Sequence, residues 1–159
     1  MEKITRLSLF VLNRSKLRRL ILGLSSRQLS FNLKHGESYV SKVEDIDQPN
    51  VYPTHEWPNL ATELKCNIHD LLPPDEMDQN SDGSTVEKKV LSLTNVDDAD
   101  MILEGLIEYG FFDSYKSEAD VANHLFVEGK EESKVITSKL EEFAKDGRLL
   151  KNNDLFIKK

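Results

Sequence analysis

The basic side chains of this 159-residue chain gather near its N-terminus, where they could hold a polyanion. Nine lysines and arginines stand against two acidic residues among residues 1–42, so this segment carries a net charge of +7. They are Lys3, Arg6, Arg14, Lys16, Arg18, Arg19, Arg27, Lys34 and Lys42. The remaining 117 residues carry −14. Such asymmetry is typical of a chain with one end facing a polyanion, but a basic cluster can equally be a solvated face without a partner.

Side chains suited to catalysis or metal binding form no recognisable pattern. The four histidines include no pair four residues apart, and no HExxH motif is present. Residues 78–83, DQNSDG, resemble the start of a calcium loop but lack its closing glutamate. No nucleophile elbow, P-loop or dinucleotide fingerprint occurs. We therefore expect no catalytic residue, no metal and no cofactor, and predict that the protein is not an enzyme.

The compartment follows from cysteine usage and apolar runs. Cys66 is the only cysteine, so an internal disulfide framework is excluded and a small buried thiol is expected. No stretch approaches the roughly 18 apolar residues of a membrane span. The apolar run SLFVL lacks the preceding charges and the small-residue cleavage site of a signal peptide. These features predict a cytoplasmic protein that does not contact membranes.

The first half of the chain shows the periodicity of short helices. Predicted helices cover residues 5–22, 26–34 and 37–45, a segment from 54 or 55 to about 64, and a short turn within 66–72. Ser25 and Gln28 form a capping-box pattern at the start of the second helix, and Gly36 lies in the turn before the third. Both helices are too short to be stable alone and need a shared core, which we expect to include Leu29 and Val40.

The second half begins after a polar segment. Residues 75–87 lack apolar periodicity and are rich in Asp, Ser, Asn and Gly, which predicts a flexible linker. The module at 88–159 should then hold a short strand at 90–94, three helices and a C-terminal hairpin. We expect the helices to cover a segment from Asp97 or Asp98 to Gly110, residues 117–126 and residues 131–145. An aromatic and proline cluster at residues 52–57 is interpreted as packing, with a partner surface as the alternative.

Residues 13–74 resemble the Cro/Xre-type helix-turn-helix family. The resemblance is carried by GLSSRQLSFNL, by the phasing of SYVSKVED and by the late LATELKCNIHDLLP. Positions that match or are conservative are Gly23, Leu24, Ser25, Leu29, Leu33, Tyr39, Val40, Ser41, Val43 and Glu44. Five positions depart from the family: Ser26 replaces a usual Gln, Ser30 a usual Ala, Lys34 a usual turn Gly, Gly36 a usual N-cap Ser or Thr, and Asp45 a usual Asn. The resemblance implies a five-helix, lambda-repressor-like domain over residues 1–74 and double-stranded DNA as the partner.

Residue roles follow from the same resemblance. The base-reading candidates, at the start of the third helix, are Glu37, Ser38, Ser41 and Lys42. The phosphate-binding candidates are Ser26, Arg27, Lys34, Tyr39, Arg14 and Arg18. Lys42 could donate to guanine and Glu37 could accept from cytosine, whereas a phosphate would gain from the free N–H groups that begin the second helix. The arginines of the first helix can instead be solubility residues, and that alternative stays open.

The second module, residues 88–159, is similar to a winged helix. Its last helix mixes acidic and basic side chains, which is unfavourable beside phosphates, so we favour dimerisation or a protein partner over a second DNA reader. The whole chain is thus predicted to be mainly α, a helix-turn-helix domain followed by a small winged-helix (α+β) domain. We predict a homodimeric transcriptional regulator. The alternative is a protein-interaction adaptor or antitoxin, favoured if the basic side chains scatter away from Glu37 and Lys42.

Overall fold

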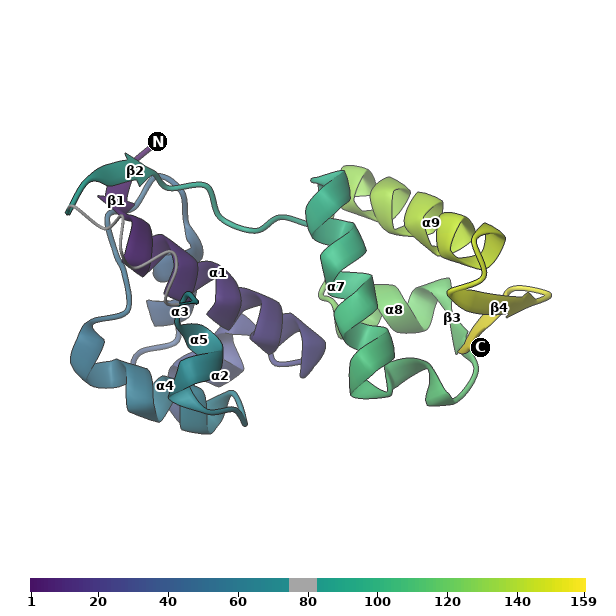
Figure 1. Ribbon diagram of the computed structural model, residues 1–159, viewed down its shortest axis with the longest axis horizontal. Helices are drawn as coiled ribbons and strands as arrows, with labels where there is room; N and C mark the ends of the chain where they lie inside the picture. Colours follow the sequence, from purple (N-terminus) through teal and green to yellow (C-terminus); the bar gives the residue numbers. More distant parts are fainter. Residues whose placement is uncertain (75–82) are drawn as a thin grey trace. The chain divides into compact units, whose positions relative to one another are not determined.

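The computed structural model describes residues 1–74 and 83–159, which form two compact units, Met1–Leu91 (unit 1) and Ser92–Lys159 (unit 2), seen in Figure 1. Both are dominated by helices, and each contains a small antiparallel sheet. Most of the predicted linker, residues 75–82, lies outside the described residues. No helix within residues 1–74 and 83–159 is both long and apolar enough to cross a membrane.

The elements of unit 1 follow the predicted helices closely. They are β1 (Lys3–Thr5), α1 (Arg6–Ile21), α2 (Ser26–Asn32), α3 (Tyr39–Glu44), the 3-10 helix η1 (Thr54–Glu56), α4 (Trp57–Glu63), α5 (Ile68–Leu71) and β2 (Thr85–Glu87). The hydroxyl of Thr5 caps α1 by accepting from the backbone of Ser8. The predicted capping box of Ser25 and Gln28 is confirmed at the start of α2. Local signals therefore set where these helices begin.

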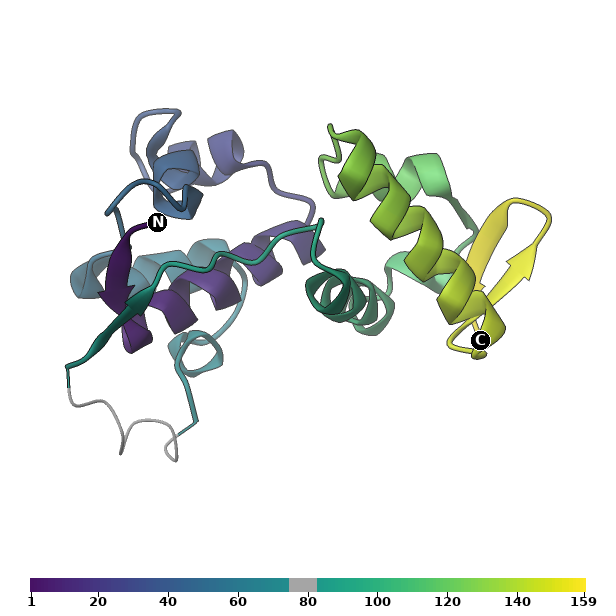
Figure 2. The ribbon, with the colours of Figure 1, turned by 90° about the horizontal axis from the view of Figure 1, so that it is seen from above.

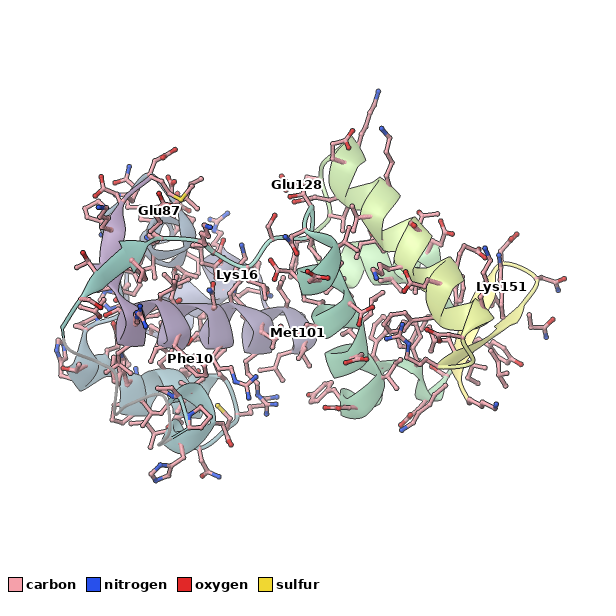
Figure 3. The ribbon with its side chains drawn as sticks, turned by 45° about the horizontal axis from the view of Figure 1, so that its top comes forward. Phe10, Lys16, Glu87, Met101, Glu128 and Lys151 are labelled. Atoms are coloured by element: carbon pink, nitrogen blue, oxygen red, sulfur yellow. The ribbon has the colours of Figure 1, made fainter. Side chains whose placement is uncertain are left out.

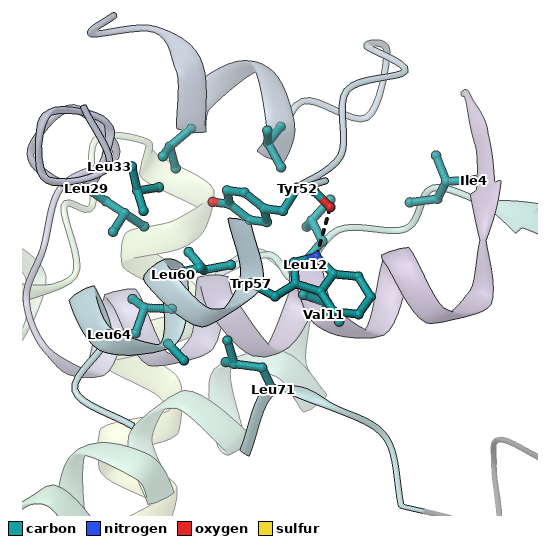
Figure 4. Packing of buried hydrophobic residues seen from close by; sticks show 13 residues of the cluster. Ile4, Val11, Leu12, Leu29, Leu33, Tyr52, Trp57, Leu60, Leu64 and Leu71 are labelled. Atoms are coloured by element: carbon teal, nitrogen blue, oxygen red, sulfur yellow. Dashed lines mark hydrogen bonds between the residues drawn. The ribbon is translucent and has the colours of Figure 1, made fainter. Parts of the chain in front are cut away.

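The core of unit 1 joins all of its helices around α1 (Figure 4). Leu12, Leu29 and Val40 are among its fully buried residues, as their helical phase predicts. The indole Nε1 of Trp57 donates to the carbonyl of Tyr52 at 2.9 Å, and both rings are buried, so the predicted packing role is confirmed. Cys66, expected to be buried, is only partly so, although that burial raises the pKa of its thiol.

Unit 1 is completed by a segment from the far side of the predicted linker. Strand β2 pairs antiparallel with β1, Lys3 opposite Glu87, and Figure 2 shows the two strands (purple and teal) side by side. The fully buried ammonium of Lys88 then donates to the carbonyls of Gln48 and Asn50 at 2.7 and 2.9 Å. Residues 85–87, predicted as the end of a flexible linker, are therefore a paired strand, and unit 1 continues to Leu91 rather than giving way to the second module near Lys88. The pairing joins segments about 80 residues apart, which no local pattern indicates.

The same segment is also fastened to α1. The Asn13 side chain donates to the carbonyl of Lys89 at 2.9 Å and accepts from the backbone N–H of Leu91 at 2.8 Å. Leu91 itself is buried. Residues 90–94 do not form the predicted strand. The hydrogen bonds from Asn13 hold the backbone of this segment against helix α1 rather than in a sheet.

Unit 2 contains the predicted helices and hairpin. Its elements are α7 (Val96–Tyr109), η2 (Phe111–Asp113), β3 (Lys116–Ser117), α8 (Glu118–His124), α9 (Lys130–Lys145), β4 (Leu149–Asn152) and β5 (Leu155–Lys158). Asn95 caps α7 by accepting from the N–H groups of Asp97 and Asp98, so the predicted cap at either aspartate is wrong. Gly110, at φ 92°, ends α7 as predicted. The sheet order is β3-β5-β4, and β3 was not predicted.

Ion pairs fasten the helices of unit 2 to its hairpin. The Arg148 guanidinium lies 3.4 Å from the centroid of the Phe143 ring and bonds to Asp100 at 3.2 Å and Asp146 at 2.6 Å. The buried Lys139 ammonium donates to Asp100 at 3.1 Å. Figure 3 shows Lys151 on the hairpin, where its ammonium pairs with a glutamate of α9. The charges of α9 are thus largely used within unit 2.

Candidate functional site

The pair α2 and α3, joined by a short turn, carries the candidate site. Ser30 connects the two helices, because its buried hydroxyl donates to the carbonyl of Ser26 at 2.8 Å and accepts from the N–H of Val40 at 3.0 Å. Lys34 lies in the turn with φ 61°, the left-handed conformation that glycine adopts most readily. Ser30 therefore has a local structural role, whereas Lys34 adopts the turn conformation without the glycine that favours it.

The base-reading candidates all lie on the exposed side of this pair. Helix α3 begins at Tyr39, so Glu37 and Ser38 lie in the turn just before it rather than in its first turn. Ser41 and Lys42 are exposed on the helix, whereas its buried residues, Val40 and Val43, face the core. The Ser41 hydroxyl donates to the carbonyl of Ser38 at 2.9 Å. The structure therefore presents Glu37, Ser38, Ser41 and Lys42 together to solvent.

An ion pair holds the C-terminal end of α3 against α1. The Arg19 guanidinium donates to both carboxylate oxygens of Glu44, at 2.8 and 2.7 Å, and to the carbonyl of Leu24 at 2.8 Å. Arg19 is only 5% exposed, and the ammonium of Lys16 lies 3.9 Å from the same carboxylate. Arg19, counted among the basic residues that could hold a polyanion or face solvent, does neither, because its buried guanidinium is paired with Glu44 and positions α3.

A second polar cluster lies beneath the turn. The buried carboxylate of Glu56 accepts from the Tyr39 hydroxyl at 2.5 Å and lies 2.6 Å from His35 Nε2. The His35 and Tyr39 rings stack with their centroids 3.7 Å apart. Burial, followed by the neighbouring Glu56, raises the pKa of Tyr39 well above its ordinary value. The Tyr39 hydroxyl is thus occupied by Glu56, and Tyr39 serves packing rather than an open phosphate contact.

Two basic side chains of α1, those of Arg14 and Arg18, bond to the backbone around α4 and α5 rather than to α3. Arg14 donates to the carbonyl of Asp70 at 3.3 Å, and Arg18 donates to the carbonyls of Leu64 and Lys65 at 3.0 and 2.8 Å. These arginines satisfy backbone groups that the ends of short helices leave without intrahelical partners. The structure therefore separates the phosphate candidates Arg14 and Arg18 from the rest of the candidate site.

The remaining phosphate candidates lie on α2 and the turn. Ser26 is partly exposed at the start of α2, whereas Arg27 and Lys34 are exposed. Arg27 pairs with Glu37 at 3.1 Å. Among the described residues, Lys34 and Lys42 form no ion pair. Beside α3, Lys34 and Lys42 are therefore the cations available to a polyanion, whereas Arg27 is paired with Glu37.

The structural roles of two positioning residues, Ser30 and Glu56, were not predicted from the sequence. Ser30 lies between Leu29 and Leu33 on the inner side of α2, so its helical phase could have indicated a buried hydroxyl that needs a partner. Glu56 gives no such signal, because its partners His35 and Tyr39 are about 20 residues away.

Neither a metal-binding cluster among the described residues nor a known related protein assigns a function to this site. Within residues 1–74 and 83–159, no group of three or more His, Cys, Asp or Glu side chains could hold a metal ion. No protein-family model matches the chain, and neither does any curated protein or any solved structure. The resemblance to the Cro/Xre family stays a prediction, and any function has to be argued from the exposed side chains of α2, the turn and α3.

Proposed function

We propose that the protein is a sequence-specific DNA-binding regulator of transcription that inserts α3 into the major groove. In this proposal unit 1 is a lambda-repressor-like helix-turn-helix domain, and unit 2, with helices α7, α8 and α9 followed by the β4–β5 hairpin, is a small winged helix. The proposal includes a homodimer, because two copies binding half-sites about one helical turn apart gain specificity.

One observation carries the proposal. Helix α3 is anchored on its inner side by Val40, Val43 and Glu44, while Ser38, Ser41 and Lys42 are exposed together on its outer side. The major groove admits one helix, whose N-terminal residues reach the base edges. A reading helix has to be rigid, because a side chain displaced by an ångström loses its hydrogen bond. The ties from Ser30 and Arg19 supply that rigidity.

The chemistry assigns a task to each exposed group. Lys42 donates to guanine O6 or N7, and the hydroxyls of Ser38 and Ser41 bond to bases or phosphate. Ser26, Arg27 and Lys34 contact the DNA backbone, which positions the protein without reading sequence. Arg14, Arg18 and Tyr39 are left out of this proposal, because their polar groups are already bonded within unit 1.

The test is retention of the full chain on a random-sequence duplex pool at two salt concentrations, followed by sequencing of the retained DNA. We expect salt-sensitive retention and an enriched, roughly palindromic motif. Lys42→Ala should relax the preference for one base pair, whereas Lys34→Ala should weaken binding to all sequences and reduce the salt slope by about 0.9. Lys134→Ala, a change in unit 2, is the control and should alter neither. Absence of retention at low salt by the folded protein contradicts the proposal.

A second candidate is a protein-interaction adaptor, with the antitoxin as one form. It is favoured by the bonding of Arg14 and Arg18 away from α3, and by unit 2, which carries fifteen acidic against nine basic residues. This candidate predicts that unit 2 binds a protein and that the chain does not retain DNA. Retention with an enriched motif would decide for the DNA-binding proposal.

A further inference from the structure

An exposed ion pair joins the two helices of the candidate site at the edge where a reading helix begins. Arg27 Nη2 on α2 lies 3.1 Å from Glu37 Oε2 in the turn before α3, and the two side chains are 69% and 63% exposed. The Arg27 guanidinium carbon also lies 5.6 Å from the centroid of the Phe31 ring, which is itself exposed. A cation suited to a phosphate and an acid suited to a base edge are therefore bound to each other in the DNA-free protein.

Such a pair is easily exchanged for DNA contacts. Exposed ion pairs are weak, because both charges stay hydrated and long side chains lose freedom when held together. A phosphate offers Arg27 an equivalent, bidentate acceptor. Once Arg27 turns to the phosphate, Glu37 is left as an uncompensated anion beside a polyanion. That repulsion is relieved only where a base presents an amino group, the N4 of cytosine or the N6 of adenine, for the carboxylate to accept.

We infer that Glu37 is a specificity-determining residue that makes the phosphate contact of Arg27 conditional on the base facing Glu37. On unmatched DNA the protein either keeps the ion pair and forgoes the phosphate, or forms the phosphate contact and exposes Glu37 to repulsion. On matched DNA both contacts form. This inference rests on the proposed function. It makes the contact of Arg27 with the DNA backbone depend on the base that Glu37 reads, so specificity comes partly from repulsion on unmatched DNA.

The inference predicts opposite effects of one substitution on the two kinds of DNA. Glu37→Gln should raise affinity for non-matching duplex on the order of fivefold, because it releases Arg27. Its salt slope should steepen by about 0.9, the value of one added phosphate contact. Affinity for the enriched motif should change little or fall, and the preference for cytosine or adenine at one position should disappear from the retained pool.

The experiment is a double-substitution cycle on the full chain. Binding to non-matching and enriched duplexes is measured over a salt series for the parent, Glu37→Gln, Arg27→Gln and the combined variant. If Glu37 acts through Arg27, the gain from Glu37→Gln on non-matching DNA is lost in the Arg27→Gln background. Asp45→Asn is the matched control, since Asp45 is an exposed acid just after α3 whose carboxylate accepts from the backbone of Asp47 at 2.9 Å. Its effect should be equal with either residue at position 27.

The possible outcomes separate the two claims. A parent protein that binds no DNA removes the proposed function and this inference together. A parent that binds DNA, with a Glu37→Gln effect that is absent or unchanged by Arg27→Gln, overturns the inference alone. Loss of the Glu37→Gln gain in the Arg27→Gln background, with loss of the base preference, supports it. Circular dichroism of each exposed-site variant verifies that the compared proteins are equally folded.

Discussion

The two units complete their small cores in different ways. Unit 1 pairs Lys3–Thr5 with Thr85–Glu87, so segments from both of its ends meet in one sheet. Unit 2 builds its sheet from β3, β4 and β5, all within its last 44 residues. Unit 1 therefore depends on a strand pair that spans almost its whole length, whereas the sheet of unit 2 is formed within the C-terminal part of that unit.

The units also differ in how two of their arginines are paired. In unit 1, Arg19 is nearly inaccessible and meets a single carboxylate, that of Glu44. In unit 2, Arg148 is partly exposed and shares its charge among several acidic groups. A buried charge that loses its one partner is costly, whereas a shared, hydrated charge is buffered. Unit 1 should be the more easily damaged by single substitutions.

The largest expected effect comes from truncation. A chain ending at residue 76 lacks β2, Lys88 and Leu91, whereas one ending at residue 91 retains them. Loss of the β1–β2 pairing, of the packing of Val90 on the core and of two hydrogen bonds from the Lys88 ammonium predicts a loss of about 4 kcal/mol or more for the shorter fragment. Urea unfolding followed by the fluorescence of Trp57, the only tryptophan, measures the difference. Equal midpoints for the two fragments would show that residues 77–91 add nothing to the stability of unit 1.

Next in size is the loss of the buried ion pair. Glu44→Gln should destabilise unit 1 by about 3 kcal/mol, because the Arg19 charge stays buried without an anionic partner. Trp57 fluorescence reports the unfolding of unit 1, and hydrogen exchange reports unit 2 separately. Glu63→Gln, a change on α4 in the same unit, is the control. A Glu44→Gln protein as stable as its parent would remove the distinction drawn between the units.

The equivalent change in unit 2 should be milder. Arg148→Met removes the cation–π interaction with the Phe143 ring and the shared ion pairs, at a cost of about 1.5 kcal/mol. Methionine retains most of the packing against the ring, which limits the loss. Hydrogen exchange of α9 and β4 amides provides the measurement. A loss of stability larger than that caused by Glu44→Gln would contradict the expectation that unit 1 is the more sensitive of the two units.

Acid should reveal the same network. Burial raises the pKa of Asp100, but hydrogen bonds from Lys139 and Arg148 outweigh that effect and hold it below its ordinary value. A carboxyl whose pKa is depressed on folding contributes stability above its unfolded pKa, about 3.9, and loses it as the pH falls through the folded value. The parent should therefore exceed Asp100→Asn by about 1 kcal/mol at pH 7. That advantage should fade below about pH 4. A difference that is independent of pH contradicts this origin.

The smallest effects should be alike in the two units. Ser25 and Ser117 each cap a short helix through a hydroxyl and a capping-box partner three residues later. Ser25→Ala and Ser117→Ala should each cost about 0.8 kcal/mol, since the cap is local and does not depend on how the unit is closed. Parallel denaturant titrations of both variants give the values. Clearly unequal losses of stability would mean that tertiary contacts also affect how much each helix cap contributes.

Much of the candidate site could be predicted from sequence. The exposure of Ser41 and Lys42 and the burial of Val40 and Val43 follow from helical phase alone. The resemblance placed Glu37 and Ser38 near the start of α3, although the helix begins two residues later than expected. What these groups do with one another was not predictable, because the Arg27–Glu37 pair depends on the relative placement of α2 and the turn.

The sequence by itself determined the order of the helices, the cap of α2 and the final hairpin, because these depend on hydrogen bonds and apolar periodicity within a few residues. Tertiary structure decided where unit 1 ends, since β1–β2 pairing and the burial of Lys88 join distant segments. It also decided the fate of the basic residues that dominate the N-terminal charge. Arg14, Arg18 and Arg19 bond within unit 1, because folding brings backbone carbonyls and the carboxylate of Glu44 within hydrogen-bond distance of them. The net charge of the segment does not predict these contacts.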